Sequence, residues 1–132
     1  MDRFYLHPLW AYAFRPFFLL AAGYAIAIIP IWLFVLFGGV DPLPWASSGL
    51  WHAHEMIYGF MVAALAGFIL TALPSWTATA PLCGRGLVLL VGLWLAGRGV
   101  MIFAAILPLE LVAGVNLAFL PVLCWLVTRA LM

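Results

Sequence analysis

Three ionisable side chains, His52, His54 and Glu55, lie within four positions of an otherwise apolar stretch of the chain. Neutral imidazole offers a lone pair near physiological pH, so histidine suits haem iron, copper or proton transfer. Ionisable groups at the edge of a membrane segment are costly and usually functional. We therefore take this cluster as the first candidate site; the structural alternative is two half-hydrated imidazoles at the membrane surface.

Helical spacing decides which of these side chains can act together. His52 and Glu55 are three positions apart, so a helix places them on one face. His52 and His54 are two positions apart, which is about 200° around the helix axis. Two histidines so placed cannot bind one metal ion from a regular helix. Each is expected to face a different neighbour, unless the first turn is irregular.

Two stripes of residues continue from this cluster along the same segment. Small residues follow Glu55 at every fourth position, namely Gly59, Ala63, Gly67 and Thr71. Such ladders let membrane helices approach closely, so the Glu55 face should be buried. The second stripe comprises His54, Tyr58, Met61 and Leu65. It could hold a flat apolar ligand such as a porphyrin, or it could simply pack against a neighbouring helix.

Arg98 is the one charge in a second apolar stretch, from residue 87 to residue 107. An arginine in the middle of a membrane segment must pair with an acid, face a polar cavity or extend to the interface. An extended Arg98 side chain could bridge most of the distance to Glu55, so we predict an Arg98–Glu55 pair, direct or through water. That pair would either fix the register of two helices or leave Arg98 to bind a ligand carboxylate in a bidentate fork.

The elements that must position these residues are membrane-spanning helices. A bilayer core about 30 Å thick needs roughly 20 consecutive apolar residues in a helix. Stretches of this kind cover residues 17–39, 51–73, 87–107 and 111–128. The sequence therefore predicts an all-α polytopic membrane protein, a four-helix transmembrane bundle over residues 17–132. Residues 1–16 form a preceding cytoplasmic segment.

Charge placement orients the predicted bundle. The cations outside the spans would all lie at one end: Arg3, Arg15, Arg85 and Arg129. The other two connections contain Asp41 and Glu110 and no arginine. Cationic residues near the ends of spans tend to stay cytoplasmic, so both termini are predicted to be cytoplasmic.

Composition excludes several classes of protein. Hydrophobic residues make up 69% of the chain and charged residues 7%, whereas a soluble domain carries about a quarter charged residues. A net charge of +1 without a cluster of cations excludes nucleic acid as a partner. The chain has no nucleophile elbow and no phosphate loop, so nothing favours a hydrolase or a kinase.

Four segments, in this order and spacing, resemble a known family. They are FRPFF at 14–18, WHAHEM at 51–56 with GF at 59–60, GFILTALPSWT at 67–77 and LWLAGR at 93–98. This ordered set resembles the NnrS family of bacterial membrane proteins. The resemblance implies a multi-pass protein of the bacterial inner membrane that contains haem and copper and acts in the response to nitric oxide. His52, His54, Glu55 and Arg98 fall on the family's polar motifs.

The resemblance also implies roles for these residues around haem b, with copper as a further metal and nitric oxide as the small ligand. His52 or His54 would be the axial ligand, and Glu55 would fix its tautomer. Arg98 would bind a haem propionate, and Tyr58 would contact the porphyrin. A haem between two protomers, or a five-coordinate haem open to nitric oxide, fits the number of histidines available as ligands.

Family members are much longer, so the resemblance covers only their N-terminal third. This chain would then be a truncated product, a short relative or one part of a split protein. Two other functions stay open beside a haem protein that acts on nitric oxide or senses it. One is a non-catalytic transmembrane module or fragment that packs into a larger assembly, as a homo-oligomer or with a partner membrane subunit. The other is a small transporter subunit with Glu55 as a protonatable group, although four spans show no inverted repeat.

Overall fold

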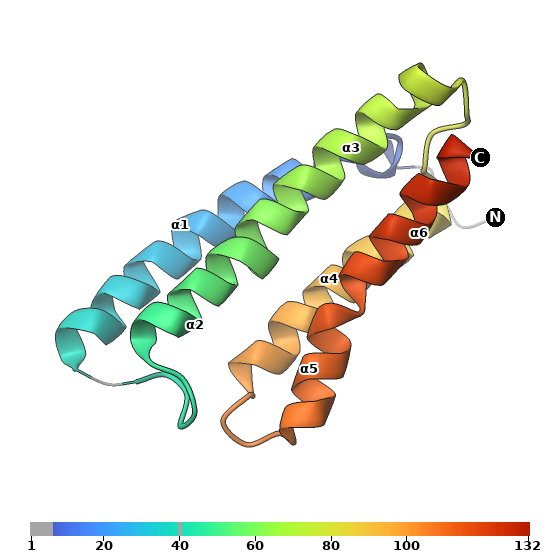
Figure 1. Ribbon diagram of the computed structural model, residues 1–132. Helices are drawn as coiled ribbons and strands as arrows, with labels where there is room; N and C mark the ends of the chain where they lie inside the picture. Colours follow the sequence, from blue (N-terminus) through green and yellow to red (C-terminus); the bar gives the residue numbers. More distant parts are fainter. Residues whose placement is uncertain (1–6, 40) are drawn as a thin grey trace.

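The computed structural model describes residues 7–39 and 41–132, and within them the chain forms four long helical spans that lie side by side (Figure 1). The first span is α1 (Phe14–Gly38), which follows a short 3₁₀ turn, η2 (Pro8–Trp10). The second consists of α2 (Ser48–His54), a π-helical segment η3 (Glu55–Met61) and α3 (Val62–Thr77). The third is α4 (Gly84–Ile102), and the fourth consists of α5 (Leu109–Leu117) and α6 (Phe119–Leu131).

The predicted all-α architecture with four spans is confirmed. Each span is long and apolar enough to cross a membrane, and the described residues contain no β-strand. Large apolar side chains cover the outside of the bundle; Phe34 and Phe37 of α1 are 81% and 84% exposed. A surface of this kind is suited to contact with lipid.

Every span differs from its expected bounds by a few residues, and two helix ends differ most. Pro74 was expected to lie in a connection, but α3 continues through it to Thr77 and ends where Ala78 adopts a left-handed conformation (φ 55°). The third span was expected to reach residue 107 and stops at Ile102. Phe103 leaves helical geometry, and its carbonyl accepts hydrogen bonds from the amides of Ile106 and Leu107 in a tight turn.

The fourth span bends between α5 and α6. Pro121 is the third residue of α6. Proline has no N–H to donate to the carbonyl four residues earlier, which is that of Leu117, and its ring crowds that carbonyl. The regular helix accordingly ends at Leu117 and begins again at Phe119. This bend is a physical consequence of one proline in an apolar segment.

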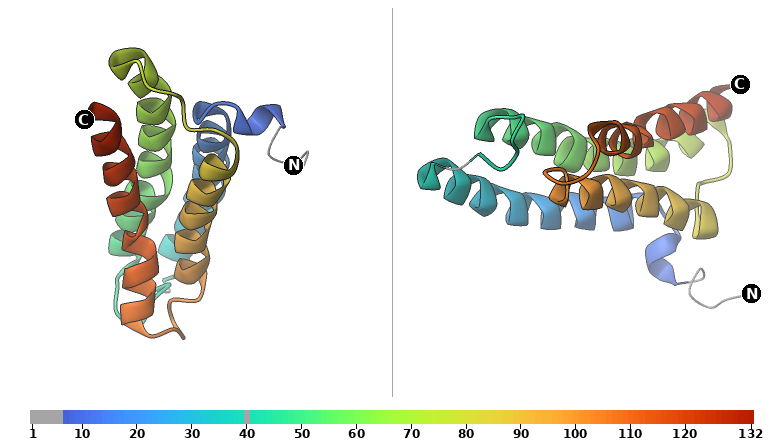
Figure 2. Two further views of the ribbon diagram at one scale, coloured as in Figure 1. Left: turned by 90° about the vertical axis from the view of Figure 1, so that its right-hand side faces the viewer. Right: turned by 90° about the horizontal axis from the view of Figure 1, so that it is seen from below.

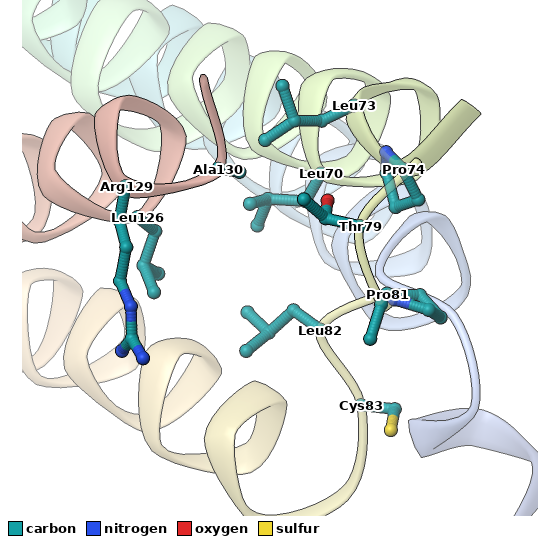
Figure 3. Close-up of a pocket in the computed structure, with 11 residues that line it drawn as sticks. Leu70, Leu73, Pro74, Thr79, Pro81, Leu82, Cys83, Leu126, Arg129 and Ala130 are labelled. Carbon is teal, nitrogen blue, oxygen red and sulfur yellow. The ribbon is translucent and has the colours of Figure 1, made fainter. Parts of the chain in front are cut away.

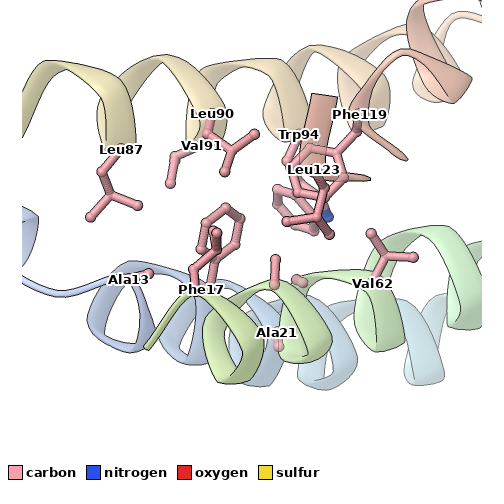
Figure 4. Close-up of a cluster of buried hydrophobic side chains, with 13 residues drawn as sticks. Ala13, Phe17, Ala21, Val62, Leu87, Leu90, Val91, Trp94, Phe119 and Leu123 are labelled. Carbon is pink, nitrogen blue, oxygen red and sulfur yellow. The ribbon is translucent and has the colours of Figure 1, made fainter. Parts of the chain in front are cut away.

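A core of buried apolar side chains joins all four spans (Figure 4). Phe17 of α1 is fully buried, and its ring meets that of Phe119 edge to face with centroids 6.0 Å apart. Figure 4 shows Phe17 pointing from α1 toward Val91 of α4. The largest buried rings therefore fill the space between the first, third and fourth spans.

Small residues bring α1 close to the second span. Gly59, Ala63 and Gly67 are buried, as expected for the Glu55 face, whereas Thr71 is exposed, and its hydroxyl accepts a hydrogen bond from the amide of Phe14 in α1. A Cβ atom on Gly67 would lie 2.9 Å from the ring of Phe18, and one on Gly59 would lie 2.2 Å from the ring of Tyr24. The predicted ladder is thus a close helix–helix contact, with α1 as its partner.

The two ends of the bundle differ in charge. The start of α1, the α3–α4 connection and the end of α6 lie at one end, and the other two connections lie at the opposite end (Figures 1 and 2). Arg15, Arg85 and Arg129 belong to the first end, and Asp41 and Glu110 to the second. Arg3 lies outside the described residues. The predicted separation of charges is present, and the cytoplasmic side remains a prediction.

Candidate functional site

The histidine cluster lies where the second span changes its helical form. His54 is the last residue of α2, and Glu55 begins the π-helical segment η3. The amide of Val62 donates to the carbonyl of Ile57, five residues earlier. π-Helical segments are rare and are frequently found at functional sites.

A contact from another span satisfies one backbone carbonyl within η3. The indole Nε1 of Trp94 in α4 donates to the carbonyl oxygen of Gly59 at 3.2 Å. Because Gly59 has no side chain, the ring of Tyr24 can lie directly against it. The rings of Tyr24 and Trp94 in turn meet edge to face, with centroids 5.5 Å apart. Two aromatic side chains from α1 and α4 therefore enclose the π-helical turn.

Glu55 lies at the centre of the site and is only 1% exposed. Its Oε2 accepts a hydrogen bond from Arg98 Nη1 at 2.6 Å and another from the hydroxyl of Tyr24. Its Oε1 lies 3.1 Å from Nδ1 of His54. The predicted Arg98–Glu55 pair is confirmed as a direct contact between the second and third spans. A buried carboxylate with three donors is well satisfied.

Asn116 of α5 closes these contacts into a circuit. Arg98 Nη2 donates to Asn116 Oδ1, and Asn116 Nδ2 lies 2.9 Å from His54 Nε2. His54, Glu55, Arg98 and Asn116 thus form a closed cycle of side-chain contacts, hereafter the polar ring. From the sequence, Asn116 is expected only to form an interhelical hydrogen bond; that bond is confirmed, and the place of Asn116 in the site was not predicted.

Hydrogen-bond roles in the polar ring fix where each proton lies. Arginine is a donor only, so the oxygen of the Asn116 amide must face Arg98. The Asn116 nitrogen then donates to His54 Nε2, which must carry a lone pair. The proton of His54 consequently sits on Nδ1 and is donated to Glu55 Oε1. The ring therefore selects one neutral tautomer of His54 and uses both of its nitrogens.

His52 takes no part in the polar ring. Its imidazole stacks on the indole of Trp32 in α1, with ring centroids 3.9 Å apart and planes 15° apart. His52 Nδ1 and Trp32 Nε1 are both buried and have no hydrogen-bond partner among residues 7–39 and 41–132. The two histidines face different neighbours, as their spacing predicts.

The second stripe is divided between a pocket and the outer surface. Tyr58 stacks on His54 with ring centroids 4.8 Å apart, and both line an open pocket of about 210 Å³ together with Asn116. Met61 and Leu65 are exposed on the outside of the span. Small-molecule sites usually enclose about 300–1,000 Å³, so this pocket is small for a porphyrin.

These contacts decide which residues suit a haem or a metal ion. His54 has no nitrogen left for a metal. Both terminal nitrogens of Arg98 bond to Glu55 and Asn116, and its Nε is buried without a partner among the described residues. The described part of the chain contains no group of three or more His, Cys, Asp or Glu side chains that could hold a metal ion. The donor set fits one axial imidazole, His52, and does not fit two histidines on one iron.

Fold and site together define a multi-pass α-helical membrane protein whose second, third and fourth spans share a buried, paired polar ring. A sequence model of one protein family, described as "NnrS protein", matches residues 8–132. The chain therefore belongs to the NnrS family. No curated protein and no solved structure matches it.

Proposed function

We propose that this NnrS-family protein binds haem b through His52 and acts in the response to nitric oxide, in the bacterial inner membrane with both termini cytoplasmic. The single observation that carries this choice of ligand is the contrast within the cluster: His54 is bonded through both nitrogens, and His52 is not. Copper is the alternative metal for the same imidazole. Family membership supports the class of function.

A bound haem would supply the iron that binds nitric oxide. His52 would hold that iron through Nε2, because Nδ1 is buried. The stacked ring of Trp32 would keep the imidazole in one orientation. The polar ring would fix the rotation of the second span, and with it the direction in which His52 leaves the helix.

The test is the visible spectrum of the detergent-purified protein, oxidised and reduced, with haem content from a pyridine haemochrome assay. We expect a Soret band that shifts on addition of nitric oxide and disappears in His52→Ala. His7→Ala is the matched control, because His7 is an exposed histidine at the opposite end of the bundle. A Soret band that survives in His52→Ala would refute the ligand assignment. Copper analysis of the same three proteins tests the alternative metal.

A second candidate function is a non-catalytic transmembrane module that packs into a larger membrane assembly, as a homo-oligomer or with a partner subunit. The closed polar ring favours it, because side chains that bond to one another across three spans hold the helices in register without any ligand. A folded, colourless protein, even after expression with added haem, would support this function. Its assembly state would follow from native mass spectrometry.

A further inference from the structure

An open pocket of about 420 Å³ lies at the end of the bundle that carries Arg15, Arg85 and Arg129 (Figure 3). It is bounded by the end of α3, the connection between α3 and α4, and the last turns of α6. Apolar side chains such as Leu70 and Leu126 form most of its wall. Arg129 is the one charged side chain that lines it.

A second pocket, of about 340 Å³, continues from the first between α4 and α6. The two share Leu82 and Leu126 as lining residues. Every other residue that lines the second pocket is glycine or aliphatic: Gly86, Leu89, Leu90, Leu93 and Val122. We call the two together the α4–α6 groove; it has a cationic mouth and an apolar interior.

Arg129 at the mouth has no anion within the described chain. It forms no ion pair and no hydrogen bond with residues 7–39 or 41–132, and its guanidinium lies 5.5 Å from the centroid of the Trp125 ring. Figure 3 shows its side chain extending from α6 beside Leu126. Arg98, by contrast, is paired with Glu55.

Aromatic residues place this mouth at the membrane surface. Trp125 lies one turn before Arg129 in α6, Trp76 lies in the last turn of α3, and both are exposed. Indole rings favour headgroup depth, where one edge is apolar and the other can hydrogen-bond. From Arg129 the groove extends inward along α6 to Val122, about 10 Å at 1.5 Å per residue.

We propose that the α4–α6 groove binds a phospholipid, with its phosphate on Arg129 and one acyl chain between α4 and α6. Guanidinium binds phosphate oxygens in a bidentate fork, and basic pockets between membrane helices bind anionic headgroups. No carboxylate lines either pocket to oppose the phosphate. The apolar interior matches an acyl chain and would reject a hydrated anion.

The test is native mass spectrometry of the full chain after titration with phosphatidylglycerol in detergent. Arg129→Gln should lower the fraction of lipid-bound protein at least fivefold. Arg85→Gln, which removes the same charge at the same end, is the control because Arg85 lines neither pocket. Equal losses in the two variants, or no loss in Arg129→Gln, would overturn the proposal.

A second pair of variants tests the acyl-chain part and separates it from charge. Gly86→Leu places a side chain in the groove, where a Cβ atom alone would lie 2.9 Å from Leu82 Cδ1. Gly92→Leu is its control on the same helix, since nothing lies within 4 Å of a Cβ there. We expect weaker lipid binding in Gly86→Leu alone. Competition by inorganic phosphate would show a free-anion site and refute the lipid.

Discussion

His52 and His54 lie two residues apart on one helix, and their surroundings differ in kind. His54 belongs to the polar ring, where both nitrogens are bonded and its tautomer is fixed. His52 lies against the flat face of Trp32, and its Nδ1 has no described partner. The same residue type in one motif is therefore bonded through both nitrogens in one place and, in the other, stacked on an indole with one nitrogen unpartnered.

The comparison also separates two kinds of energy. The polar ring places a carboxylate and a guanidinium in a medium without water, where their attraction is strong only while both are present. The stacked pair of Trp32 and His52 is held by ring contact and apolar burial, which are weaker and less dependent on geometry. Loss of one ring member should therefore cost far more than loss of either stacked residue.

The largest effect is expected for Arg98→Met, which leaves Glu55 buried without its counter-charge. Removing one partner of a buried pair costs about 3–5 kcal/mol. The measurement is the free energy of unfolding, from SDS titration of the protein in mixed micelles followed by circular dichroism. Adding Glu55→Gln to Arg98→Met should recover most of the loss. A single variant as stable as the parent would show that the ion pair does not hold the spans together.

The difference between the two histidines is tested by replacing each of them with phenylalanine. His54→Phe keeps the stack on Tyr58 but removes the partners of Glu55 Oε1 and Asn116 Nδ2. Each buried group left unsatisfied costs about 1–3 kcal/mol. His52→Phe keeps the stack on Trp32 and breaks no hydrogen bond with a described residue, so it should cost under about 1 kcal/mol. Equal losses of unfolding free energy in the two variants would show that the two histidines do not differ in their contribution to stability.

The sequence predicts the spans and one contact of the site for a common reason. Water is absent from a bilayer core, so long apolar stretches must be helices and a charge inside them must find an opposite charge. That reasoning gives four spans and the Arg98–Glu55 pair, both of which are confirmed. The two-residue spacing of the histidines, about 200° around a helix, separately places them on different sides.

The other features of the site and the fold depend on tertiary contacts that no local sequence pattern encodes. Asn116 is an uncharged residue 62 positions from His54, and only the packing of α5 against α4, which carries Arg98, brings Asn116 within reach of His54. The π-helical turn depends on Trp94 reaching the carbonyl of Gly59, and on Tyr24 lying over that glycine. Pro74 is accommodated within α3, although proline more often ends a helix.

A smaller effect is expected where the first and second spans touch beside the polar ring. A Cβ on Gly59 would lie 2.2 Å from Tyr24 Cε1, so Gly59→Ala should displace the ring whose hydroxyl donates to Glu55. Overpacking of this kind costs about 1–3 kcal/mol. Gly23→Ala is the control, because nothing lies within 4 Å of a Cβ at that position of α1. Equal unfolding free energies for the two variants would contradict the close contact.

The smallest effect on stability is expected for Trp32→Leu, which removes the ring that stacks on His52. An aromatic pair contributes about 0.5–1.5 kcal/mol beyond its buried area, and the polar ring remains intact. If His52 holds haem, losing this stack frees the imidazole to rotate, so haem affinity should fall while the unfolding free energy falls only by about this amount. Tyr58→Leu is the matched control, because it removes the ring stacked on His54 instead. Haem affinity that falls in Tyr58→Leu and not in Trp32→Leu would move the ligand from His52 to His54 and reverse the comparison.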